Sequence, residues 1–103
     1  MSTQVGYTFE WDPEKNAANV RKHGVHFLKA SQIFHDPRAI TVFDVWHSDK
    51  EERWYTIGVD RGANVLVVNH THRQGPQGEV HLRLISARKP NQRERGQYFR
   101  RKP

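Results

Sequence analysis

Apolar positions in the first third of the chain recur with the period of a helix. Residues 13–23 follow Asp12, a residue type that caps helix starts well, and they begin with Pro13, whose missing N–H has no partner in a first turn. Gly24 then supplies the left-handed conformation that ends many helices. Residues 27–35 carry apolar residues at helical spacing again, and an Asp-Pro pair ends that run. The sequence therefore predicts two short helices joined by a tight connection.

Beyond residue 38, apolar and polar positions alternate, which is the period of a strand. The alternation predicts four strands, at residues 39–45, 53–60, 65–71 and 80–86. Polar or glycine-containing segments separate these strands, and such short loops favour antiparallel neighbours.

A third helix is predicted at residues 91–100, where Asn91 and Glu94 have the spacing of a capping box. Its few apolar side chains, Tyr98 and Phe99, either dock weakly on the sheet or meet a partner chain. The order of elements predicts an α+β fold with two N-terminal helices, a four-stranded antiparallel sheet and a C-terminal helix. One face of this sheet is expected to be covered by helices and the other to be open.

Composition supports a single folded domain over residues 1–103, with residues 1–8 as a loosely ordered segment or a short extended arm. The mean hydropathy is low, at −0.92, but three Trp, three Tyr and five Phe provide material for a core. The absence of cysteine excludes disulfides and a thiol nucleophile. Without a signal peptide or an apolar run of membrane-spanning length, the protein is expected to be cytoplasmic, with no membrane contact.

Charge is divided unevenly between the two halves of the chain. Residues 1–52 contain six Lys/Arg and eight Asp/Glu, whereas residues 53–103 contain eleven Lys/Arg and three Asp/Glu. The first half therefore carries a net charge of −2 and the second half +8, which together give the net charge of +6. Such a basic half is typical of proteins that bind a polyanion, and we expect the partner to be RNA.

Several cationic residues fall at one end of the predicted strands. Strict alternation places Val80, Leu82, Leu84 and Ser86 on the covered face and Arg83 on the open face. The other members of this predicted cluster are Arg53, Arg88, His70 and His72.

Such a cluster suits cleavage of RNA by its own 2′-OH, without a metal or other cofactor. Guanidinium groups can stabilise the charge that builds on phosphorus, and a histidine can move protons at neutral pH.

The polar residues allow three other interpretations. His70 and His72 have strand spacing and His47 or His81 could complete a metal site, but no cysteine or nearby carboxylate supports one. Asp44, His47 and Asp49 resemble an acid–base set, but a solvated loop explains them more simply. A DNA-binding repressor acting alone ranks last, because no helix-turn-helix with a basic recognition helix is present.

Several short motifs together resemble the BrnT family of bacterial toxins over about residues 9–99. They are Phe-Glu-Trp-Asp-Pro at 9–13, Lys-His-Gly-Val at 22–25, Phe-His-Asp-Pro at 34–37, Glu-Glu-Arg at 51–53, Thr-Ile-Gly at 56–58, Arg-Leu-Ile-Ser-Ala-Arg at 83–88 and Arg-Glu-Arg at 93–95. The resemblance implies a RelE-like ribonuclease fold and the toxin role in a type II toxin–antitoxin pair. It also implies RNA cleavage that arrests translation, neutralisation by a BrnA-type antitoxin, a possible heterotetramer, and DNA contact only through that antitoxin.

The resemblance also suggests roles for particular residues. Arg53, Arg83 and Arg88 would bind phosphate and stabilise the transition state, and Lys22 or His70 would transfer protons. The remaining cations and the last helix would make contacts: Arg73, Arg93 and Arg95 with RNA, and Tyr98, Phe99 and Arg100 with the antitoxin. A second hypothesis stays open, in which a degenerate toxin-like module binds RNA or an antitoxin without cutting.

Overall fold

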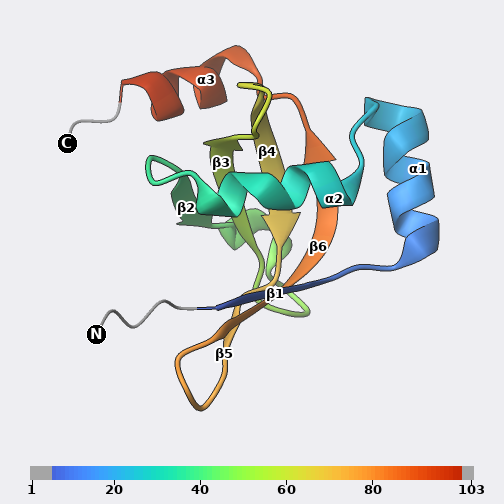
Figure 1. Ribbon diagram of the computed structural model, residues 1–103, viewed down its shortest axis with the longest axis vertical. Helices are drawn as coiled ribbons and strands as arrows, with labels where there is room; N and C mark the ends of the chain where they lie inside the picture. The colour runs from blue at the N-terminus through green and yellow to red at the C-terminus, as the bar shows by residue number, and fades with distance from the viewer. Residues whose placement is uncertain (1–5, 101–103) are drawn as a thin grey trace.

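The computed structural model describes residues 6–100, and it confirms an α+β fold with a larger sheet than the sequence predicts (Figure 1). Six strands form one sheet in the order β1-β6-β4-β3-β2, with β5 paired to β6 off this path. The strands are β1 (Tyr7–Glu10), β2 (Ile40–Phe43), β3 (Trp54–Val59), β4 (Val65–His70), β5 (Arg73–Gln74) and β6 (Val80–Arg88).

Two of these strands are absent from the sequence-based prediction. β1 pairs in parallel with the first half of β6, and β5 pairs antiparallel with the same segment. The prediction of four purely antiparallel strands is therefore wrong, because β1 is too short to show an alternating pattern and β5 lies inside a glycine-containing loop. Of the segment predicted to be loose, residues 1–5 lie outside the described part of the chain, and Tyr7 and Thr8 belong to β1.

The predicted helices are present, with changes at their ends. They are α1 (Pro13–His23), α2 (Phe27–Ala30), which continues as the 3-10 turn η1 (Ser31–His35), and α3 (Gln92–Phe99). A further 3-10 turn, η2 (Val45–His47), follows β2 where the sequence predicts the end of a strand. None of the helices in residues 6–100 is long and apolar enough to cross a membrane.

Polar anchors compensate for the small apolar surface of α1. Asn19 is buried and pairs with the backbone of Ala87 in both directions, donating to its carbonyl at 2.8 Å and accepting from its N–H at 3.1 Å. The amide of Asn19 also donates to the Val25 carbonyl at 2.8 Å. In the same way Asn16 accepts from the N–H of Phe27 at 2.8 Å and caps α2, a task that the preceding His26 does not perform. The two bonds between Asn19 and Ala87 dock α1 onto the edge of β6.

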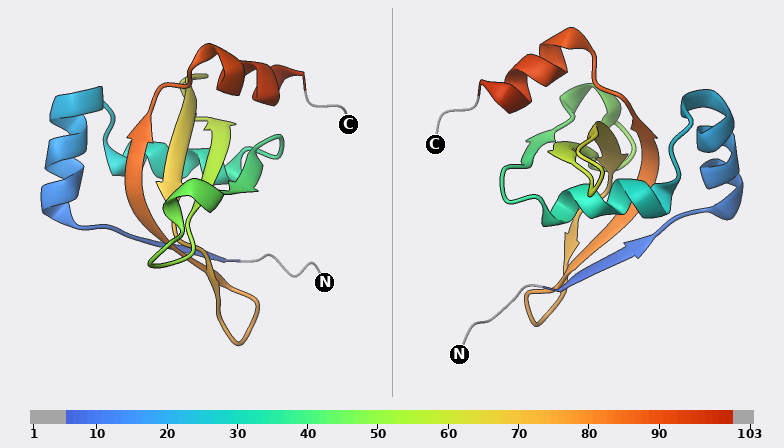
Figure 2. Two further views of the ribbon diagram at one scale, coloured as in Figure 1. Left: turned by 180° about the vertical axis from the view of Figure 1, so that it is seen from behind. Right: turned by 45° about the horizontal axis from the view of Figure 1, so that its top comes forward.

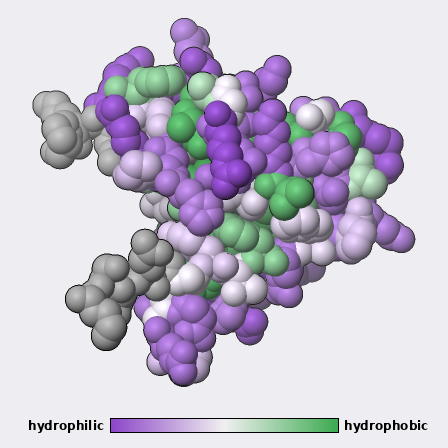
Figure 3. Space-filling model, viewed as in Figure 1, coloured by the Kyte–Doolittle hydropathy of each residue, from purple (hydrophilic) through white to green (hydrophobic). Residues whose placement is uncertain are grey.

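The two faces of the sheet carry different cores. On one face α1, α2 and η1 cover a cluster that includes Phe27, Ile33, Leu66, Val68 and Leu84. Figure 1 and the two views in Figure 2 show α2 crossing this face while α3 lies at one end of the sheet. The outer surface on the α2 side is mostly hydrophilic, with hydrophobic side chains in small separate groups (Figure 3).

The opposite face, expected to be open, is covered at one end by α3. Tyr98 packs there with Ile57, Val65 and Val67, and its hydroxyl donates to Asp36 at 2.6 Å. α3 is therefore anchored at Tyr98, and the rest of this face remains accessible to ligands.

Candidate functional site

A hollow of about 480 Å³ opens on the α3 side of the sheet. Side chains from β3, β4 and β6 form its floor, and residues of η2 and the start of α3 line its sides. The view from behind in Figure 2 looks onto this side, with η2 in front of the strands. Arg53, Arg88 and Arg93 provide the cations, and Asp44 and Glu94 the carboxylates.

A β-bulge decides which β6 side chains reach the hollow. Asn69 pairs with Ser86, but the next β4 residue, His70, pairs with Leu84, so Ile85 has no partner of its own. This extra residue reverses the alternation of β6. Ser86 and Arg88 line the hollow, and the prediction that Ser86 shares a face with Leu84 is wrong.

Arg88 is held in the hollow by a carboxylate. Its two terminal nitrogens donate to the two carboxylate oxygens of Glu94 at 2.8 and 2.9 Å, and Glu94 also completes the capping box with Asn91. These hydrogen bonds from Arg88 lower the pKa of Glu94 and raise that of Arg88, so both groups stay charged over the physiological range. The pair fixes the first turn of α3 beside the end of β6.

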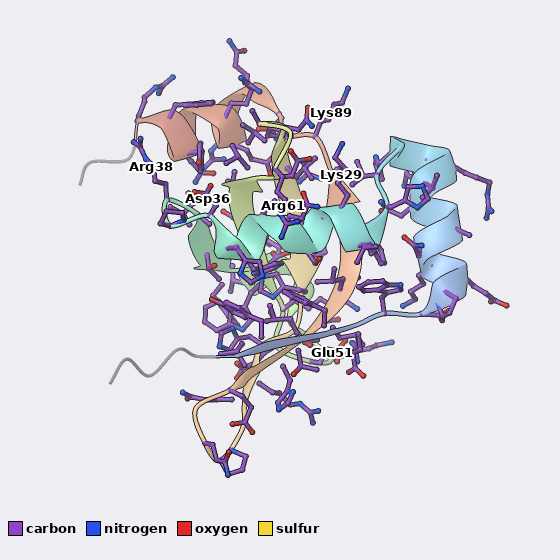
Figure 4. The ribbon with its side chains drawn as sticks, viewed as in Figure 1. Lys29, Asp36, Arg38, Glu51, Arg61 and Lys89 are labelled. Carbon is purple, nitrogen blue, oxygen red and sulfur yellow. The ribbon has the colours of Figure 1, made fainter. Side chains whose placement is uncertain are left out.

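Arg53 is held less tightly by carboxylates than Arg88 is. Its Nη2 lies 3.6 Å from Glu51, and its Nε is buried with no hydrogen-bond partner among the described residues. Glu51 also accepts a hydrogen bond from Arg83, so one carboxylate links the two arginines. Arg83 lines an adjoining depression with Glu10, Glu51 and Glu52, at the end of the paired segment of β1 and β6. Figure 4 labels Glu51 in this region. The three arginines predicted to converge are thus split: Arg53 and Arg88 share the hollow, and Arg83 lies beside it.

A histidine oriented by a carboxylate stands at the rim of the hollow. Asp44 Oδ2 lies 2.8 Å from His47 Nδ1; because a carboxylate accepts, Nδ1 carries the proton. Nε2 has no hydrogen-bond partner among residues 6–100, which leaves its lone pair available to a ligand. The Asp44 side chain is buried, whereas that of His47 is 66% exposed. Asn69 donates to the same carboxylate oxygen at 3.3 Å and accepts from Ser86 at 3.2 Å, so a polar network runs from β6 to η2.

Backbone bonds fix this turn against β3. The Asp44 N–H donates to the Arg53 carbonyl at 2.8 Å, and the Ser48 hydroxyl donates to the Asp44 carbonyl at 2.6 Å while accepting from the Arg53 N–H at 2.9 Å. The sequence-based interpretation of Asp44 and His47 as a solvated loop missed this arrangement. The spacing of three residues, followed by a serine that can close a turn, is the signal that could have revealed it.

His70, predicted to transfer protons from the open face, lies on the other face of the sheet. It is only 1% exposed and its ring packs against Phe34. Nδ1 donates to the Thr71 carbonyl at 2.8 Å, so Nε2 accepts from the Thr56 hydroxyl at 2.7 Å. Burial lowers the pKa of His70 to about 4, and it therefore remains neutral and out of contact with any ligand in the hollow. We assign it a structural role.

The remaining predicted site residues are scattered. Lys22 is exposed at the end of α1 and lines neither the hollow nor the depression that contains Arg83, so the structure does not bring it to the arginines. Arg93 lines the hollow, while Arg73 is exposed on β5 beside Arg83. The others are in or near α3, on another side: Arg95, which stacks on Phe99 with its guanidinium carbon 5.3 Å from the ring centre, Phe99 itself, and the exposed Arg100. Tyr98, predicted to contact an antitoxin, is buried and bonded to Asp36 instead.

Within residues 6–100 no three His, Asp or Glu side chains gather closely enough to hold a metal ion. The hollow itself presents guanidinium, imidazole and carboxylate groups.

Comparison with known proteins places the chain in a class, the ribonuclease toxins of type II toxin–antitoxin systems. A family model described as "Ribonuclease toxin, BrnT, of type II toxin-antitoxin system" matches residues 11–94, and the chain belongs to the BrnT family. The crystal structure of the Brucella abortus ribonuclease toxin BrnT is similar in fold, with a TM-score of 0.53 and 23% sequence identity. That match covers 85% of this chain and 100% of the Brucella chain. No curated protein sequence matches the chain.

Proposed function

We propose that this protein is a metal-independent endoribonuclease toxin that uses the hollow between β3, β6 and α3 as its active site. The observation that carries the proposal is the Asp44-oriented His47 at the rim of a hollow that also contains Arg53 and Arg88. A positioned base beside guanidinium groups is what attack by an RNA 2′-OH requires. Membership of a family of ribonuclease toxins supports the same conclusion.

In the proposed reaction, His47 Nε2 accepts the proton of the 2′-OH as O2′ forms a bond to phosphorus. The bond from phosphorus to O5′ breaks, a solvent water protonates O5′, and the resulting hydroxide accepts the proton held by His47. The products are a 2′,3′-cyclic phosphate and a 5′-OH. Asp44 is a positioning residue that holds the His47 tautomer and stabilises the imidazolium, while Arg53 and Arg88 stabilise the charge on phosphorus.

An RNA cleavage assay in the presence of a chelator tests this function. We expect the wild-type protein to cut RNA and Arg53→Ala to lower the rate about 100- to 1,000-fold, the loss typical of removing one donor to a developing charge. Arg61→Ala is the matched control, because Arg61 is exposed in the β3–β4 turn on the α2 side (Figure 4) and should leave the rate unchanged. Equal rates for wild type and Arg53→Ala would contradict the assignment of the site.

A second candidate function is supported by the pairing of arginines with carboxylates. Glu94 binds Arg88, and Glu51 bridges Arg53 and Arg83, so part of the positive charge is neutralised within the protein. A module of this kind could bind RNA or an antitoxin without cutting. In the assay above it would give salt-sensitive binding with no cleavage products.

We further propose that a BrnA-type antitoxin neutralises the toxin by contacting the groove between α2 and α3. Phe99 is 58% exposed there, and Lys29, Lys89 and Arg95 line the same groove (Figure 4 labels the two lysines). An acidic amphipathic segment would match this combination of aromatic and positive groups. Phe99 and Arg100 remain the proposed contacts, with DNA reached only through the antitoxin; whether the complex is a heterotetramer can be measured by its mass in solution.

A further inference from the structure

We propose that Trp46 is a stacking platform for an unpaired base, and that the hollow therefore takes single-stranded RNA. This inference rests on the proposed ribonuclease site, because Trp46 immediately precedes His47 in η2 and lines the same hollow. It adds the class of substrate to that proposal.

The exposure of Trp46 sets it apart from the other aromatic residues. It is 88% exposed, more than any other large hydrophobic side chain in residues 6–100. Trp11 and Trp54, in contrast, pack against neighbouring rings. The ring centroids lie 6.1 Å apart for Trp11 and Phe27 and 5.0 Å apart for Trp54 and Phe43. An indole left in water at the edge of a polar hollow has apolar area that only a ligand can cover.

The backbone that carries Trp46 is held in place before any ligand arrives. The residues on either side of the turn are tied together by the Asp44 N–H bond to Arg53 and by the Ser48 hydroxyl. Because the turn is fixed against β3, stacking on the indole requires little ordering of the main chain.

The groups around Trp46 match the parts of a nucleotide. Arg53, with a buried Nε that has no partner among the described residues, and the exposed Arg93 can bind phosphate. Gln97 supplies an amide donor and acceptor for a base edge or a ribose hydroxyl, and Asn91, whose oxygen caps α3, supplies its amide NH₂ as a donor. An aromatic face beside cations and amides is how proteins hold single-stranded RNA, because a base in a duplex has both faces stacked on its neighbours.

An exposed tryptophan could instead insert into a pocket on a protein partner, since tryptophan is a common anchor at interfaces. The arginines and the His47–Asp44 pair in the same hollow favour RNA, because a protein anchor would not require them. The experiment below separates the two occupants.

Binding of a single-stranded oligonucleotide with 2′-O-methyl riboses tests the proposal without cleavage, because no free 2′-OH can attack. We expect Trp46→Ala to weaken binding about 5- to 150-fold in fluorescence anisotropy, as a stacked base contributes on this scale, and Trp46→Phe to retain most of the affinity. Leu28→Ala is the control; Leu28 is 70% exposed on α2 and should bind like wild type. A duplex of the same sequence should bind without dependence on Trp46.

Equal affinity of Trp46→Ala and wild type for the single strand would overturn the proposal, as would a loss confined to binding of an antitoxin. Failure of the ribonuclease itself gives a different result: Trp46-dependent binding of the oligonucleotide persists while no RNA is cut. Conversely, RNA cleavage by Trp46→Ala with an unchanged kcat/KM would remove the stacking role and leave the ribonuclease intact.

Discussion

His47 and His70 occupy opposite faces of the same sheet, and their surroundings give them opposite properties. His47 lies in a turn and is 66% exposed, with a carboxylate on Nδ1 and, within the described part of the chain, no partner on Nε2. His70 is 1% exposed, with Thr71 and Thr56 satisfying both ring nitrogens. The comparison shows that residue type alone does not mark a proton-transfer group: a histidine needs an unoccupied nitrogen that faces the ligand.

Replacement of His47 should have the largest effect on activity. We expect His47→Ala to lower the rate of RNA cleavage about 100- to 10,000-fold, the range for removal of a general base. Its thermal midpoint should remain within a few degrees of wild type, because the ring is exposed and packs in no core. A rate close to that of wild type would mean that another group accepts the proton.

The pH dependence of the free energy of unfolding should show that His70 is buried in its neutral form. Its pKa is about 4 in the folded protein and 6.5 for an unperturbed histidine, so the unfolded chain binds more protons between these values. The stability that neutral His70 contributes to the folded state is fully present above pH 6.5 and is lost as the pH falls towards 4. We expect wild-type protein to lose about 2 kcal/mol of this contribution between pH 7 and pH 5, measured by urea unfolding.

His70→Gln should remove this loss of unfolding free energy between pH 7 and pH 5. His26→Gln, at an exposed position before α2, should retain it. The cleavage rate of the folded fraction of His70→Gln should match wild type. A large loss of activity in that fraction would revive a catalytic role for His70 and break the comparison between the two histidines.

Tyr98 joins the two sides of the molecule, and its replacement should have the smallest effect. Tyr98→Phe deletes the hydrogen bond to Asp36, the residue that follows η1, and should lower the free energy of unfolding by about 1–2 kcal/mol. Gln92→Ala, at an exposed site of the same helix, is the control and should change it by less than about 0.5 kcal/mol. Chemical denaturation at pH 7 measures both; an unchanged Tyr98→Phe would show that α3 is held mainly by Arg88 and Glu94.

Local patterns predicted most of the elements but little of the site. The caps of α1 and α3 depend on neighbouring residues, and both Asp12 and the Asn91–Glu94 box act as the sequence indicates. Pairing between distant segments left no such signal. β1 joins β6 across more than 70 positions, and Asn19 docks α1 through backbone groups of Ala87.

Two errors at the site come from limits of strand periodicity. Strict alternation along β4 correctly separates His70 from Asn69, but it cannot say which face a helix will cover. Along β6, alternation fails beyond Leu84 because the bulge at Ile85 is invisible in the order of apolar and polar residues. Positive charge alone predicts Arg53 and Arg88 as site residues, and both line the hollow. Their carboxylate partners, Glu51 and Glu94, are not evident from the sequence and are seen only in the structure.

The bulge at Ile85 lets β6 hold one residue more than β4 over the same stretch. Without the bulge, the same residues in an unbroken repeat would turn Arg88 towards the core beneath α2 and Ala87 towards the hollow. A guanidinium group would then face a layer of Leu and Phe side chains that cannot solvate it. Deletion of Ile85 would instead remove the bulge and leave Ser86 and Arg88 on the hollow side. Active relatives of this chain should therefore have either the bulge or a β6 that is shorter by one residue there.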